Sequence, residues 1–196
     1  MAKPYSIAAA GQAILGLLAS ACPRADFPAA QFELYQARNF QSPMDEGIAL
    51  YLHRITPANN IRNLPPRIAP DGRRYRPSVP IDLHYLVIAW ARDAVKQQRL
   101  LGWAIRTIED TPTLTAGVLN QPGPEPDMFF PGESLDLIME TFVIQDMGSI
   151  WDVTKPNIPL AVAYTARILE LDSSLEMTEA SVAQTRVFRA GKLVGV

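Results

Sequence analysis

The chain contains a single cysteine, Cys22, among its 196 residues. One thiol excludes a disulfide framework and any metal site built from several thiolates of one chain. Net charge is also small, −2 at pH 7, so the chain as a whole is not drawn to nucleic acid or anionic lipid. Only 19% of its residues are charged, whereas 48% are hydrophobic. This balance excludes an intrinsically disordered protein and predicts one soluble domain with a core of its own.

Basic side chains are missing from one long segment. No Lys or Arg lies between Arg106 and Lys155, where these acidic residues accumulate: Glu125, Asp127, Glu133, Asp136, Glu140, Asp146 and Asp152. An earlier segment has the opposite bias and carries Arg54, Arg62, Arg67, Arg73, Arg74 and Arg76 against only Asp71. Such segregation is typical of two solvated faces or of two patches that meet in an interface. The sequence leaves both interpretations open.

Proline, in contrast, is abundant, with 17 residues. Six lie from Pro57 to Pro80 and four from Pro122 to Pro131, whereas 81–111, 132–155 and 160–196 have none. Because proline fixes φ and removes a backbone donor, it avoids helix interiors and central strands. The map therefore predicts two long, stiff loops, and loops of this length in a compact domain tend to be functional.

Residues 5–22, YSIAAAGQAILGLLASAC, have some likeness to a bacterial lipoprotein signal. The lone Lys3, the polar Gln12 within the stretch and Ala19 three residues before Cys22 count against it. We expect an amphipathic helix instead, which Pro23 ends and which is a poor membrane span. Its predicted apolar side comprises Ile7, Ile14, Leu17, Leu18 and Ala21.

The rest of the sequence predicts strands and one further long helix. Segments 32–37, 47–56, 81–91, 134–142 and 159–171 are expected to be strands, the second and third covered on both faces. Asp93 is the expected N-cap of the helix, Pro112 ends it, and 146–153 is a short helix. The expected buried stripe of the long helix is Ala94, Leu101, Ala104, Ile105 and Ile108.

This order lacks regular βαβ alternation, so we predict an α+β fold. A mixed β-sheet is flanked by the N-terminal helix and one long middle helix, with two long proline-rich loops. The expected domain spans 1–172. Segment 173–196 is then either a terminal hairpin on the parent sheet or an arm that pairs with another subunit's sheet edge.

Residues that carry chemistry are few. His53 and His84 each lie in an apolar strand, where a histidine is typically a hydrogen-bonded core or interface residue. Asp82 and His84 share a strand face, but no hydrolase, zinc-protease, dithiol or phosphate-loop motif accompanies them. We expect no enzyme, no metal and no cofactor. A ligand site near Asp82 and His84 is the rival hypothesis from another class.

The arginine-rich loop 54–76 also suggests a non-catalytic ligand- or nucleic-acid-binding adaptor, since arginines and Tyr75 can grip phosphate and base. The acidic half would repel a polyanion, so nucleic acid is the less favoured partner.

Several stretches occur in an order that resembles a known family. They are EGIALYLHRITPANNIRN (46–63), RPSVPIDLHYLVIAWARD (76–93), QRLLGWAIRTIEDTPTL (98–114), SIWDV (149–153) and IPLAVAYTARILELDS (158–173). Over residues 1–173 the chain resembles the cap, or tail-terminator, family of phage-tail-like contractile injection systems of the antifeeding-prophage and virulence-cassette type. It departs from the family's usual pattern at Gln98, at Val87-Ile88-Ala89 and in segment 76–80.

The resemblance implies a ring, a hexamer, of α+β subunits at the end of the tube distal to the baseplate. There the ring binds the last ring of the inner tube protein, of the sheath protein, or of both, and stops polymerisation. It further implies no catalysis, no cofactor and no membrane. The protein would be assembled in the bacterial cytoplasm and then be part of the injection particle.

A ring of identical chains needs two unlike patches that fit each other, and the basic loop and the acidic half supply such a pair. The residues we predict for subunit, tube or sheath contacts are Arg54, Arg62, Arg67, Arg73, Arg74, Tyr75, Arg76, Glu125, Asp127, Glu133, Arg186, Arg189 and Lys192.

Overall fold

The computed structural model of the chain describes residues 3, 5–58, 64–69, 71–121, 127–141, 148, 152 and 160–177. Its helices are α1 (Ser6–Ala21), η1 (Ala37–Gln41, a 3₁₀-helix), α2 (Ala94–Asp110) and α3 (Ala116–Leu119). Its strands are β1 (Gln31–Tyr35), β2 (Gly47–Pro57), β3 (Arg67–Ile68), β4 (Arg74–Tyr75), β5 (Val79–Trp90), β6 (Thr113–Thr115), β7 (Ser134–Glu140) and β8 (Leu160–Leu171).

Six of the strands form one mixed sheet in the order β1-β2-β5-β8-β7-β6. β1 runs parallel to β2, and every other pairing in this sheet is antiparallel. β3 and β4 form a separate two-stranded ribbon. The predicted α+β fold with a mixed sheet, an N-terminal helix and a middle helix is therefore confirmed.

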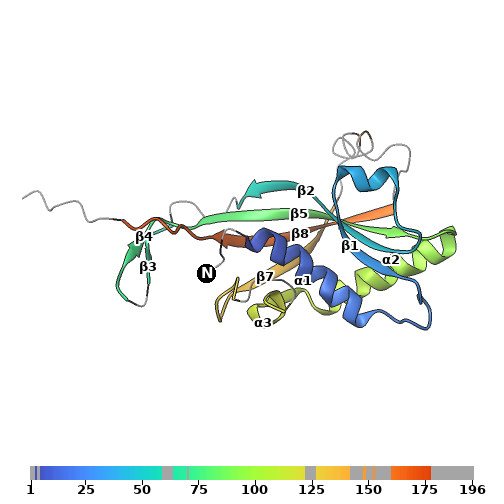
Figure 1. Ribbon diagram of the computed structural model, residues 1–196, viewed down its shortest axis with the longest axis horizontal. Coiled ribbons are helices and arrows are strands. Elements are labelled where there is room, and N and C mark those ends of the chain that lie inside the picture. The colour runs from blue at the N-terminus through green and yellow to red at the C-terminus, as the bar shows by residue number, and fades with distance from the viewer. Residues whose placement is uncertain are drawn as a thin grey trace, which may run out of the picture.

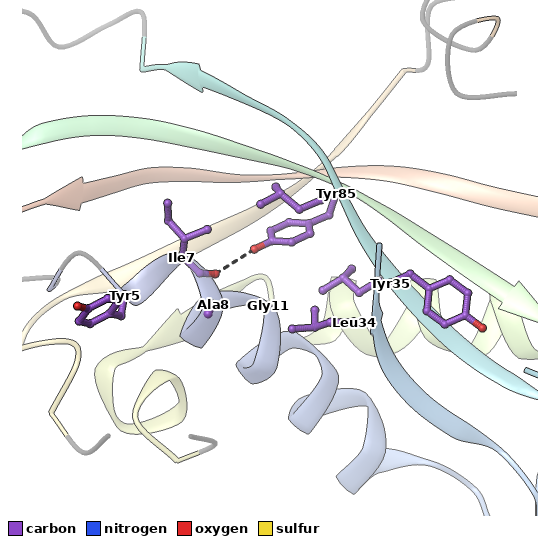
Figure 2. A pocket seen from close by; sticks show the side chains of 9 residues that line it. Tyr5, Ile7, Ala8, Gly11, Leu34, Tyr35 and Tyr85 are labelled. Atoms are coloured by element: carbon purple, nitrogen blue, oxygen red, sulfur yellow. Dashed lines mark hydrogen bonds between the residues drawn. The ribbon is translucent and has the colours of Figure 1, made fainter. Parts of the chain in front are cut away.

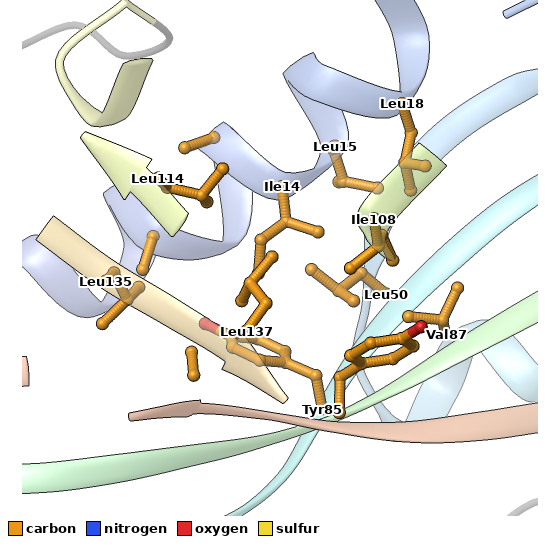
Figure 3. Close-up of a cluster of buried hydrophobic side chains, with 14 of the residues drawn as sticks. Ile14, Leu15, Leu18, Leu50, Tyr85, Val87, Ile108, Leu114, Leu135 and Leu137 are labelled. Carbon is orange, nitrogen blue, oxygen red and sulfur yellow. The ribbon is translucent and has the colours of Figure 1, made fainter. Parts of the chain in front are cut away.

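The main core lies between one face of the sheet and helices α1, α2 and α3 (Figure 1). Alternate residues of β5 point into it, among them Leu83, Tyr85 and Val87, and meet Ile14 of α1 and Ile108 of α2 (Figure 3). On the other face, η1 covers part of the sheet with Phe40, which packs in a second cluster of buried side chains. Because both faces of β5 are covered, its sequence is apolar at nearly every position.

The middle helix begins after Asp93 and ends before Pro112, as the sequence predicts. The Asp93 carboxylate accepts a hydrogen bond from the Lys96 amide at 2.8 Å, which makes Asp93 the N-cap of α2. The prediction of the buried helix faces is wrong at two residues, since Ala21 and Ala94 are exposed. Each lies in an end turn, beyond the part of the helix that contacts the sheet. Leu100, which was not predicted, is fully buried.

The first proline-rich loop is not entirely irregular. It contains the β3–β4 ribbon, and β5 already begins at Val79, so the expectation of a plain stiff loop up to Pro80 is wrong. Two-residue strands are too short to show a periodic pattern. Of the predicted short helix 146–153, only residues 148 and 152 are described, and residues 178–196 of the expected C-terminal arm lie outside the described residues.

Gly47 has a specific role at the start of β2. Its φ is +150°, and it pairs with Gln31 of the parallel strand β1. A Cβ at this position would overlap the Gln31 backbone and lie 2.6 Å from the sulfur of Met44. The close approach of the first two strands therefore depends on glycine.

We predict that Gly47→Ala lowers the free energy of unfolding by about 2 kcal/mol or more, because a strained φ and a backbone clash must both be relieved. Gly102→Ala is the matched control, since a Cβ there meets no atom within 4 Å. In the interior of α2 it should raise stability by roughly 0.5–1 kcal/mol. Denaturant unfolding of the two variants measures both, and equal stabilities would contradict the prediction.

Candidate functional site

The most distinctive surface feature is a narrow arm that we define as β3, β4 and residues 175–177. Tyr75 of β4 forms an antiparallel bridge with Glu176. The Arg76 amide donates to the Leu175 carbonyl at 3.1 Å, and the Met177 amide donates to the Arg74 carbonyl at 2.7 Å. Residues 175–177 are thus a third strand-like segment beside the ribbon, and the arm extends away from the helices (Figure 1).

The arm continues the central ladder of the sheet. Val79 of β5 pairs with Leu171 of β8, and Tyr75 pairs with Glu176 a few residues further out, with a shift of one residue in register. The Ser78 hydroxyl donates to the Asp172 carboxylate at 2.5 Å between the two pairs. The arm is therefore held by the same two chain segments that form the middle of the sheet.

One face of the arm, the inner face, is occupied by contacts within the chain. Paired residues of a ladder share a face, so Arg67, Tyr75 and Glu176 lie together on it. The Arg67 guanidinium lies over the Tyr75 ring at 4.5 Å from its centroid, and Arg67 Nε is 3.7 Å from the Asp172 carboxylate. These contacts tie β3 to β4 and to the chain that follows β8.

Arg73 is also engaged locally. Its backbone amide and its guanidinium both donate to the Asp71 carboxylate, the latter at 2.6 Å. The Arg73 amide first, and its side chain second, hold the pKa of Asp71 below the ordinary value. Arg73 therefore stabilises the β3–β4 turn in addition to any contact it makes elsewhere.

The opposite face of the arm, the outer face, is different. By the two-residue period of strands it carries Ile68, Arg74, Arg76, Leu175 and Met177. All five side chains are exposed. The outer face is thus apolar and cationic at once.

A second candidate surface is a hollow of about 330 Å³ beside β7 and the end of β8, which we call the acidic hollow. Three carboxylates, those of Glu133, Asp136 and Glu170, line it together with one arginine, Arg167. Ile168, an exposed residue with φ of +61°, adds an apolar wall. The excess of carboxylates makes the hollow attractive to cations.

Two of these carboxylates also shape the hollow. Glu133 accepts a hydrogen bond from the Phe130 amide at 2.8 Å and so closes the turn before β7. Asp136 accepts one from the Thr113 hydroxyl at 2.7 Å and joins β7 to β6.

The structure distributes the predicted contact residues over several places. Arg67, Arg73, Arg74, Tyr75 and Arg76 come together on the arm, and Glu133 lines the acidic hollow. Arg54 lies on β2, outside the arm, and Asp127 is an exposed residue with φ of +60°. Arg62, Glu125, Arg186, Arg189 and Lys192 lie outside the described residues.

Sequence reasoning missed Ile68, Leu175 and Met177 on the arm, and Asp136 and Glu170 in the hollow. Asp136 lies on β7 and is exposed. The sequence gives no signal for the apolar residues of the arm. The β3–β4 pairing places Ile68 on one face with Arg74, and the bridge between Tyr75 and Glu176 places Leu175 and Met177 there too.

The histidines lie away from both surfaces. His84 is buried, and its Nε2 is 2.8 Å from the Thr56 hydroxyl. Its Nδ1 is 2.9 Å from the Thr165 hydroxyl and 3.1 Å from the Glu140 carboxylate. The His53 ring is 6.2 Å from the His84 ring, centroid to centroid. His84 thus connects β2, β7 and β8 by hydrogen bonds, as expected of a core histidine.

The Asp82 carboxylate accepts a hydrogen bond from the Ile168 amide at 2.9 Å. That bond supports the irregular backbone of β8, where the register with β5 shifts and Ile168 has a positive φ. Among the described residues, no three His, Cys, Asp or Glu side chains are grouped so as to hold a metal ion.

An apolar pocket of about 420 Å³ lies between α1 and the strands β1, β2 and β5 (Figure 2). Leu34, Leu50 and Leu52 contribute to its lining, and the Tyr85 hydroxyl donates to the Ile7 carbonyl at 3.4 Å. Burial raises the pKa of this hydroxyl above its ordinary value.

In the part of the chain that is described, no helix is both long and apolar enough to span a bilayer.

Comparison with known proteins gives one family and two structures. The model of the Pvc16 N-terminal domain family matches residues 11–185. No curated protein matches the sequence. The PVC sheath/tube terminator of an extracellular contractile injection system, in its extended state, is similar with a TM-score of 0.59 and 15% identity, over 95% of this chain and 65% of that chain.

The tube-terminating cap of the anti-feeding prophage is similar with a TM-score of 0.56 and 15% identity, over 91% of this chain and 60% of that chain. The chain thus spans less than two thirds of either protein. At this identity the likeness shows a shared fold.

The Arg67–Tyr75 contact should hold residues 175–177 on the arm. In Arg67→Ala and Tyr75→Ala we expect about two- to fivefold faster hydrogen exchange at the Met177 and Arg76 amides, because a cation–π contact stabilises by roughly 0.5–1 kcal/mol. Arg92→Ala, an exposed arginine paired with Asp45, is the control and should leave both rates unchanged. Unaltered exchange in both arm variants would show that the contact does not hold the segment.

Glu140 should make stability depend on pH. Burial acts to raise its pKa, but hydrogen bonds with Thr165 and His84 outweigh burial and lower it from the ordinary 4.5. The stabilisation is therefore complete above the unfolded pKa and is lost as pH falls through the folded one. We expect Glu140→Gln to lose less stability than wild type below pH 4.5, measured by denaturant unfolding, with Glu33→Gln on β1 as the control. The prediction would be refuted if the free energy of unfolding of Glu140→Gln fell with decreasing pH as steeply as that of the wild type.

Proposed function

Because this chain belongs to the Pvc16 N-terminal domain family, we propose that it is a structural terminator that caps the tube and sheath of a contractile injection system. The observation that carries the proposal is the similarity of fold to the PVC sheath/tube terminator over 95% of this chain. The similarity to the anti-feeding prophage cap, a second tube-terminating protein, supports the same role.

The proposed mechanism is a non-catalytic one. The terminator binds the last tube ring, the last sheath ring, or both, and stops polymerisation because its exposed face does not offer the next tube or sheath subunit a site. Its surface carries a cationic arm and an acidic hollow at different places. Two unlike, complementary patches on identical chains favour head-to-tail contacts, and these close into a ring. The proposed ring is a hexamer.

The proposed location follows from the role. The chain is made and assembled in the bacterial cytoplasm and then forms part of the injection particle. The adaptor that binds nucleic acid through loop 54–76 is less well supported, because Arg67 and Arg73 of that loop already contact Tyr75 and Asp71.

The role is tested by co-expressing the tube, sheath and baseplate proteins with and without this chain. With the chain we expect capped particles of one length, and without it tubes and sheaths whose lengths vary widely, because nothing ends their growth. Electron microscopy measures the lengths and shows whether a six-fold ring occupies the capped end. Particles of normal, uniform length without the chain would refute the proposal, and a salt-sensitive shift of bound nucleic acid would favour the adaptor.

A further inference from the structure

The outer face of the arm has the composition of a protein interface. Ile68 is 67% exposed, Leu175 57% and Met177 40%. Arg74 and Arg76 lie beside them on the same face. Exposed apolar side chains grouped with arginine mark a protein contact rather than a solvated surface.

The acidic hollow has the complementary character. Glu133, Asp136 and Glu170 surround it against the single Arg167. An apolar side chain of its lining, Ile168, is 37% exposed. A hollow of about 330 Å³ has room for a few side chains. A strand that lies across it would point alternate side chains into it.

We propose that the outer face of the arm docks in the acidic hollow of a second copy of this chain. Arg74 and Arg76 meet the carboxylates of Asp136 and Glu170, and Leu175 and Met177 cover the apolar wall at Ile168. The inference deepens the proposed terminator role and rests on it, since it names the contact between neighbouring subunits of the ring.

The arm cannot reach the hollow of its own chain. The hollow reaches Glu170 at the end of β8, and Leu175, where the arm begins after β8, lies five residues further along the chain. At about 3.3 Å per residue the arm begins roughly 16 Å beyond the hollow. The ladder between β5 and β8 runs into the arm and directs it outward. A contact between arm and hollow is therefore a contact between two copies.

This contact is also head-to-tail. The surface given by one copy, the arm, differs from the surface that the other copy supplies. An open chain of subunits therefore keeps one unused arm at one end and one unused hollow at the other until it closes into a ring. Charge complementarity additionally opposes contact between two arms or two hollows.

Paired cysteines test the contact directly. Ser134 also lines the acidic hollow. In a Cys22→Ala background, Leu175→Cys on the arm and Ser134→Cys in the hollow are combined and treated with a short bis-maleimide. We expect a ladder of covalent oligomers that ends at the ring, and no ladder from either single-cysteine variant. Covalent dimers of the Leu175→Cys variant alone would show an arm-to-arm contact and overturn the proposal, as would the absence of a ladder from the double variant.

Charge exchange provides the second test. Arg74→Glu with Arg76→Glu should weaken self-association by at least about tenfold in sedimentation, and Asp136→Lys with Glu170→Lys should do the same. Combining all four substitutions should restore the ring, since each repulsive pair becomes attractive again. Arg92→Glu with Arg106→Glu changes the charge equally at exposed sites elsewhere and should have no effect. Failure of the combined variant to recover, when each double variant is folded by circular dichroism, would refute the contact.

The two proposals fail in different ways. If the chain caps particles of uniform length but the paired cysteines in those particles do not react with each other, the arm contact is wrong and the terminator role stands. If the cross-linked ring forms but particle length does not depend on the chain, the terminator role is wrong.

Discussion

The antiparallel pairing of β5 with β8 is the interaction on which the rest of the structure depends. Within the sheet it places Tyr85 opposite Tyr164 and Leu83 opposite Ala166, side by side in the main core. Beyond Val79 and Leu171 the same two segments continue into the arm. Core and arm are therefore parts of one ladder, and a change that weakens its middle also loosens the surface at its end.

The sequence predicts the interior of this fold better than its edges. β5 is apolar on both faces because both are covered, and Asp93 and Pro112 bound α2 by backbone chemistry that acts within a few residues. The arm could not be predicted in this way. Its third segment pairs with β4 across about one hundred residues of chain, and the Arg67–Tyr75 contact exists only after that pairing forms.

The sequence predicts which charged residues cluster at the candidate site, but it does not predict how they are arranged on the surface. The clustering of arginine before β5 and of carboxylates before β8 is visible in the sequence, and the structure brings Arg74 and Arg76 together on one face. Arg67 and Arg73 of the same cluster contact Asp172 and Asp71 of their own chain. Ile68 and Leu175 contribute to the candidate site because they share one face of the arm, and no local sequence pattern predicts that shared face.

The position of β8 in the chain also affects when the arm can exist. β8 and residues 175–177 follow every other described element in sequence, so they leave the ribosome after all of these. Until then β5 has only β2 as a partner, and β4 lacks the segment that holds Arg76 and Arg74 in line. A nascent chain that has not yet released β8 and residues 175–177 therefore presents no complete arm.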